Sequence, residues 1–128
     1  DGMPGFIVGG PTPFETKLVK TRWLPIFGND CKSYIIISNR VIGNNKPSKV
    51  IFKAKLFNSY KENPLNSVLI VEPYENKIIK PSQIHKNALD FLRNNHGWLY
   101  LESDKSQSTN IHYASLMGNG SIACDHGF

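Results

Sequence analysis

A chain of 128 residues, 40% hydrophobic and 20% charged, is long enough for one globular domain with a buried core and too apolar for a disordered chain. No apolar run approaches the roughly 18 residues that span a bilayer, which argues against a membrane partner. The net charge of +5 suits nucleic acid, but only Arg22, Arg40 and Arg93 of the 15 basic residues are arginines, the residue that reads bases best. We therefore expect a partner other than nucleic acid.

The N-terminal segment, residues 1–16, is rich in glycine and proline and predicts an irregular arm. Residues 17–128 predict a single domain. Its first long strand is 17–24, which Pro25 ends or holds at a sheet edge. Because the chain begins at Asp1 rather than Met, we expect an excised domain or a processed chain. We also expect a soluble, cytoplasmic protein.

Two further strands follow. Residues 33–39 form the most apolar segment and lack polar alternation, so we expect a central strand that is covered on both faces. After the loop 43–48, residues 49–57 return antiparallel and alternate with a period of two. The side expected to face the core carries Val50, Phe52, Ala54 and Leu56.

The segments 67–72 and 76–80 predict two more strands around the turn 73–75. The period then changes to that of a helix. Apolar residues at i, i+4, i+7 and i+8 from Ile84 predict one amphipathic helix over 83–94. We expect this helix to cover a face or an end of the sheets.

The C-terminal third predicts three strands, at 98–103, 110–117 and 121–124, the last two joined by the turn 118–120. The chain thus contains seven or eight short strands joined by Gly, Asn and Pro turns. This pattern predicts a mainly β fold, an antiparallel β-sandwich with one short helix, and a partly open barrel is the alternative.

The strand 98–103 carries a stripe of aromatic residues. If its leucines point into the core, then Trp98, Tyr100 and Glu102 share the outer face, and we expect Tyr113 of the next strand across from them. Aromatic rings stack on sugar C–H groups, and a carboxylate accepts hydrogen bonds from hydroxyls. The same stripe suits a subunit interface, or the core itself if the two faces are reversed. All three interpretations stay open.

A second candidate site lies near the C-terminus, where His112 precedes the last hairpin and Asp125 and His126 follow it. Imidazole and carboxylate groups can hydrogen-bond a ligand, and with the thiolate of Cys124 they are also ligands of transition metals. Because the spacing matches no zinc motif, we expect no metal and no cofactor. We expect both Cys31 and Cys124 to be buried free thiols. A small enzyme or a metal site that uses His112, Asp125 and His126 is the alternative.

Three lysines, Lys49, Lys53 and Lys55, alternate on the side of the strand 49–57 that faces away from the core. Three like charges in a row can contact phosphates, which makes nucleic-acid binding a further alternative. Lysines also prevent a sheet edge from pairing with another chain, and this is the interpretation that we favour.

Three segments carry a resemblance to a known family. They are Tyr34-Ile35-Ile36-Ile37-Ser38-Asn39, Val50-Ile51-Phe52-Lys53-Ala54 and Trp98-Leu99-Tyr100-Leu101-Glu102-Ser103-Asp104. In this order they resemble the small prokaryotic β-sandwich domains of the sensory rhodopsin transducer type. The resemblance implies a β-sandwich that forms homo-oligomers and binds small molecules or proteins without catalysis. It assigns a role to no individual residue.

We therefore predict a binding or assembly module rather than an enzyme. Its ligand is a polar small molecule such as a sugar, or another protein chain, a second copy included. The residues predicted to contact the ligand are Trp98, Tyr100, Glu102, His112, Asp125 and His126.

Overall fold

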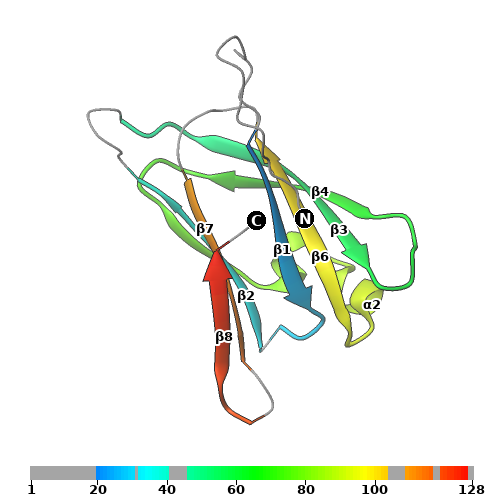
Figure 1. The fold of residues 1–128 in the computed structure, drawn as a ribbon. Coiled ribbons are helices and arrows are strands. Elements are labelled where there is room, and N and C mark those ends of the chain that lie inside the picture. Colours follow the sequence, from blue (N-terminus) through cyan, green and yellow to red (C-terminus); the bar gives the residue numbers. More distant parts are fainter. Residues whose placement is uncertain (1–19, 31, 41–45, 104–108, 117–118, 127–128) are drawn as a thin grey trace, which may run out of the picture.

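The computed structural model describes residues 20–30, 32–40, 46–103, 109–116 and 119–126, which form a β-sandwich of two four-stranded antiparallel sheets (Figure 1). The predicted fold class is confirmed, while the expected arm lies outside the described residues. In spatial order the first sheet contains β1 (Lys20–Phe27), β6 (His96–Ser103), β3 (Val50–Asn58) and β4 (Leu65–Val71). The second sheet contains β5 (Asn76–Ile79), β2 (Ser33–Asn39), β7 (Thr109–Leu116) and β8 (Ile122–His126).

The chain crosses repeatedly between the two sheets. β2 and β3 belong to different sheets, so the predicted antiparallel return of 49–57 onto 33–39 is wrong. β3 alternates as expected, but alternation identifies the buried face of a strand and not its neighbour. The connection 40–49 is long enough to cover the roughly 10 Å between packed sheets.

The core fills the space between the sheets. The side chains of β3 that were expected to face inward are at most 1% exposed. Each fully buried aliphatic or aromatic side chain of this kind contributes about 1.5–3 kcal/mol to folding. The inward side chains of the other long strands include Leu24, Ile26, Ile35, Ile37, Leu99, Leu101 and Ile111.

The strand β2 is internal, as predicted, because it pairs with β5 on one side and with β7 on the other. Its inner face is fully buried at Ile35 and Ile37. Tyr34 and Ile36 on its other face are only half-buried, so the expectation that both faces are covered is wrong for the outer face.

The predicted helix over 83–94 is two short helices, α1 (Pro81–Ile84) and α2 (Ala88–Leu92). The break follows from a local competition, because the backbone N–H of Asn87 donates to His85 Nδ1 at 3.0 Å and closes a turn. The apolar stripe is nevertheless used as predicted, since α1 and α2 bury side chains against the core.

Candidate functional site

The outer face of the first sheet carries the aromatic stripe. Leu99 and Leu101 are fully buried, so the alternate residues of β6 point away from the core. Trp98 is accordingly 44% exposed, and Tyr100 and Glu102 are half-buried. The predicted outward orientation is confirmed, and the interpretation of this stripe as core is wrong.

Four aromatic side chains lie on this outer face, and three of their rings are in contact. The strand register places Trp23 opposite Tyr100 and Phe57 opposite Trp98. The ring of Trp23 lies 4.8 Å from that of Tyr100 and 5.6 Å from that of Phe57, measured between ring centroids. Because β6 lies between β1 and β3, the Trp23 ring reaches across β6 to make the second contact. We call Trp23, Phe57, Trp98 and Tyr100 the aromatic face.

The two additional members of the aromatic face were missed in the sequence. Trp23 and Phe57 each lie on the correct side of an alternating strand, and this was the available signal. What the pattern lacks is the spatial order of β1, β6 and β3, which brings the rings together. Tyr113 was expected across from Trp98 but lies in β7 of the second sheet, where it packs on the core, so that expectation is wrong.

A polar pair adjoins the aromatic face. The hydroxyl of Tyr100 donates a hydrogen bond of 3.3 Å to Oε1 of Glu102. Partial burial raises the pKa of Tyr100, and the negative charge and the hydrogen bond of Glu102 raise it further. The register places Lys53 of β3 opposite Glu102, and Lys55 opposite Tyr100. Aromatic, acidic and basic groups therefore share one surface.

The lysines require a correction. Lys53 and Lys55 are exposed on the same outer face as the aromatic rings. They do not protect a sheet edge, since β3 is an internal strand between β6 and β4. The interpretation that we favoured for them is therefore wrong, because the neighbours of β3 were not known.

Aliphatic side chains extend the surface toward β4. Ile51 of β3 lies opposite Ile70 of β4, and Val68 of β4 lies opposite Lys53. All three aliphatic side chains are exposed, Val68 to 59%. We call Ile51, Val68 and Ile70 the aliphatic corner. Four strands at about 4.8 Å spacing and eight residues of length give this sheet face roughly 500 Å².

The C-terminal candidates lie elsewhere. His112 is exposed on β7 of the second sheet, and the register places it opposite His126. Asp125 is exposed and pairs with Tyr113, so it lies on the opposite face of the hairpin from His112. The structure therefore does not bring the six predicted contact residues into one site.

This end of the chain also carries candidate metal-binding side chains and a cysteine. In the described ranges, three or more His, Cys, Asp or Glu side chains are nowhere arranged to hold a metal ion. Cys124 is an exposed free thiol rather than a buried one, because β8 is an edge strand that pairs with β7 alone among the described strands. Cys31 lies outside the described residues.

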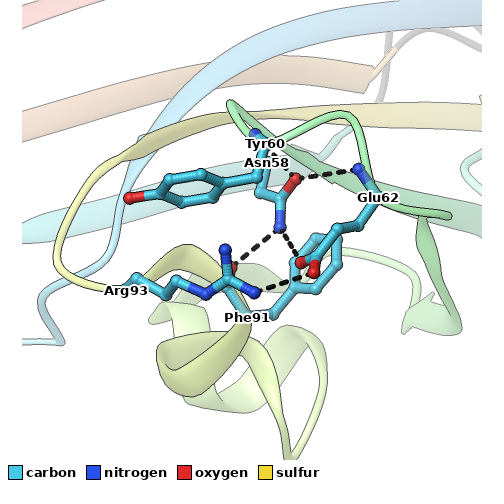
Figure 2. Close-up of polar contacts among 5 residues, drawn as sticks. All are labelled: Asn58, Tyr60, Glu62, Phe91 and Arg93. Carbon is cyan, nitrogen blue, oxygen red and sulfur yellow. Dashed lines mark hydrogen bonds and ion pairs between the residues drawn. The ribbon is translucent and has the colours of Figure 1, made fainter.

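A second polar cluster fixes the end of β3 next to the aromatic face (Figure 2). Asn58 Nδ2 donates to Glu62 Oε1 at 2.8 Å and to the backbone oxygen of Phe91 at 3.0 Å. Its Oδ1 accepts from the backbone N–H groups of Tyr60, at 3.1 Å, and Glu62, at 3.4 Å. One amide thus ties the connection between β3 and β4 to α2.

An ion pair closes the same cluster. The guanidinium of Arg93 donates to Glu62 Oε2 at 2.8 Å and lies 4.3 Å from the centre of the Tyr60 ring (Figure 2). The hydrogen bond from Asn58, followed by that from Arg93, lowers the pKa of Glu62. We call Asn58, Tyr60, Glu62 and Arg93 the Asn58 latch. The polar groups of the latch bond to one another, so the latch holds Phe57 and the loop after β3 in place.

An open hollow lies beside the latch and not on the aromatic face. Asp30 at its rim accepts a hydrogen bond of 2.9 Å from the backbone N–H of Ser82, so this carboxylate already fixes the start of α1. The hollow is lined by Gly28, Asn29, Asp30, Leu89, Asp90, Arg93 and Asn94.

Comparisons of the chain with known protein families, with curated proteins and with solved structures gave no match. The resemblance to the sensory rhodopsin transducer type therefore stays a prediction. Among the described residues, no helix has the length and apolar character needed to cross a membrane.

Proposed function

We propose that this protein is a non-enzymatic module that binds another protein through the aromatic face. The observation that carries the proposal is the exposed cluster in which Trp23 contacts both Tyr100 and Phe57 beside Trp98. Tryptophan and tyrosine are the residues that most often supply the binding energy of protein interfaces. Their large rings lose little conformational entropy on binding.

The shape of the cluster favours a protein over a sugar. The Trp23 ring is tilted by 50° to Tyr100 and by 35° to Phe57, so these rings form an uneven ridge rather than a flat platform. The aliphatic corner continues the apolar surface, and valine and isoleucine have no polar group that can recognise a hydroxyl.

The charged side chains beside the aromatic face indicate the charge that the partner surface carries. Lys53 and Lys55 are exposed beside the rings, and Glu102 is the one acidic side chain that the described β strands place on this face. Complementary charge steers encounter and selects the register. The partner surface is therefore expected to combine an apolar centre with acidic flanks.

Single-stranded nucleic acid is the second candidate, for one specific reason. The lysines of β3 lie next to Tyr100 and Phe57, and rings interleaved with basic groups are how single strands are bound without sequence preference. Glu102 on the same face opposes phosphate, which is why we place this candidate second.

One experiment separates the candidates. The immobilised full chain selects binders from a random peptide library, in parallel with Trp98→Ala and with Ile78→Ala. Ile78 is 61% exposed on β5 of the other sheet and provides the matched control. We expect acidic, apolar peptides that bind the wild type and Ile78→Ala at least about tenfold better than Trp98→Ala. A Trp98-dependent, salt-sensitive affinity for oligothymidine together with no selected peptides would contradict the proposal.

A further inference from the structure

We infer that two copies of this chain pair through the free edge of β4, which joins their first sheets into one eight-stranded antiparallel sheet. The inference goes beyond the proposed function, since it concerns the backbone edge of β4, although Val68 and Ile70 of this strand also belong to the aliphatic corner. Within the described residues, β4 is the end strand of the order β1-β6-β3-β4 and pairs only with β3. Its other side presents the backbone groups of a seven-residue strand.

The four edge strands differ in how they are protected against such pairing. Proteins protect edges with charged residues, with proline, or by keeping the strand very short. β1 contains Lys20, Arg22 and Pro25. β5 has only four residues, with Lys77 among them, and the five residues of β8 include Asp125 and His126. The sequence of β4, Leu-Asn-Ser-Val-Leu-Ile-Val, has neither a charge nor a proline.

The exposed side chains of β4 are mostly apolar, and in an edge-to-edge pair they would lie beside those of the neighbouring strand. Val68 and Ile70 are exposed to 59% and 40%, beside Ile51 of β3. Strand-forming aliphatic residues on a flat, uncharged edge are the features that invite another strand. Pro64 and Pro73 flank the strand and limit such pairing to β4 itself.

A second copy of β4 fits this edge in an antiparallel register centred on Val68. In that register Val68 faces Val68 of the second copy, and Asn66 faces Ile70 on the same side of the sheet. On the inner side Ser67 faces Leu69 and Leu65 faces Val71, so apolar residues continue into the two cores. Such a seven-residue pair forms roughly six to eight backbone hydrogen bonds.

The net charge of +5 on each chain does not prevent this pairing of two copies. The nearest lysine on the outer face is Lys53, which is one strand away from Val68. In the pair the two Lys53 backbones are three strand spacings apart, about 14 Å, which exceeds the screening length of about 8 Å at physiological salt. Because the contact is isologous, it closes at two copies.

Sedimentation of the full chain over a range of concentrations tests the inference. We expect a species of twice 14.4 kDa. Val68→Lys should weaken the dimer at least about tenfold, because it opposes two like charges at the centre of the pair. Ile78→Lys places the same charge on an equally exposed residue of β5 and should leave the dimer intact.

A mixing experiment tests the register and controls for misfolding. Val68→Lys and Val68→Glu are each expected to be monomeric, and an equimolar mixture is expected to recover the dimer, because opposite charges then meet. A monomeric wild type, a dimer that survives Val68→Lys, a dimer lost in Ile78→Lys, or a mixture that stays monomeric would each overturn the inference. Loss of the dimer in Trp98→Ala would also overturn it, since the copies would then meet through the aromatic face.

Discussion

The ring of Trp23 packs against the ring of Tyr100 directly across the β1–β6 pair, with centroids 4.8 Å apart. The same ring also contacts Phe57 on β3, so Trp23 links three neighbouring strands on the outside of the sheet. The aromatic face is therefore both a candidate binding surface and a part of the packing of the fold.

Trp23→Ala is expected to lower the free energy of unfolding by about 1–3 kcal/mol, because it removes two ring contacts and the area that they bury. Trp98→Ala should cost less, below about 1 kcal/mol, because the two indoles are similarly exposed, to 41% and 44%, but both ring contacts described above belong to Trp23. Urea unfolding followed by circular dichroism measures both values. A larger loss for Trp98→Ala than for Trp23→Ala would contradict the assigned packing.

Tyr100 is expected to titrate above the ordinary tyrosine range, because burial and Glu102 both favour its neutral form. Glu102→Gln should lower this pKa only part of the way, since burial is the larger cause. A folded-state pKa above the unfolded one means that the stabilising contribution is present below the unfolded pKa and is lost as the pH rises through the folded pKa. NMR titration of labelled tyrosine rings would test this, and an unshifted Tyr100 would contradict it.

Asn58→Ala is expected to destabilise the protein by about 2 kcal/mol, because the amide makes four hydrogen bonds that hold the end of β3. Arg93→Ala should have a smaller effect, because the ion pair with Glu62 is exposed to solvent. Thermal unfolding of the two variants compares them. An equal loss of stability in the two variants would contradict the larger role assigned to the Asn58 amide.

Gly97→Ala is expected to destabilise by about 1–3 kcal/mol, because a Cβ atom there would collide with the backbone oxygen of Phe57 and the side chain of Leu92. Gly97 is a buried residue of β6. Gly120→Ala meets no neighbouring atom and is the control for space, although its φ of 88° adds backbone strain. Unchanged stability in Gly97→Ala would show that the strands can move apart.

The sequence predicted the strands well because strands such as 49–57 and 98–103 have their own period-two pattern and turn residues bound the others. The buried side of 49–57 follows from that pattern alone, whereas the pattern of 98–103 left open which of its two faces is buried. The spatial order of the strands could not be predicted in the same way, because it depends on packing between segments far apart in the chain. Trp23 and Phe57 were missed as partners of Tyr100 for this reason.

The helix shows a different limit of sequence analysis. Its apolar stripe was interpreted correctly, since Ile84, Ala88 and Leu92 are buried. At the break between α1 and α2 the backbone of His85 is extended and its ring accepts a hydrogen bond from the backbone N–H of Asn87, neither of which periodicity contains. The grouping of His112 with Trp98 failed because the two residues lie on different sheets.

Both tryptophans of the chain, Trp23 and Trp98, lie on the aromatic face, so their indole N–H resonances report directly on this surface. The most direct test of the proposed binding surface is an NMR titration of the full chain with a selected acidic, apolar peptide. The account predicts that both indole resonances shift, while the amide of Ile78 on the second sheet does not. Indole resonances that stay in place while amides of the second sheet shift would contradict it.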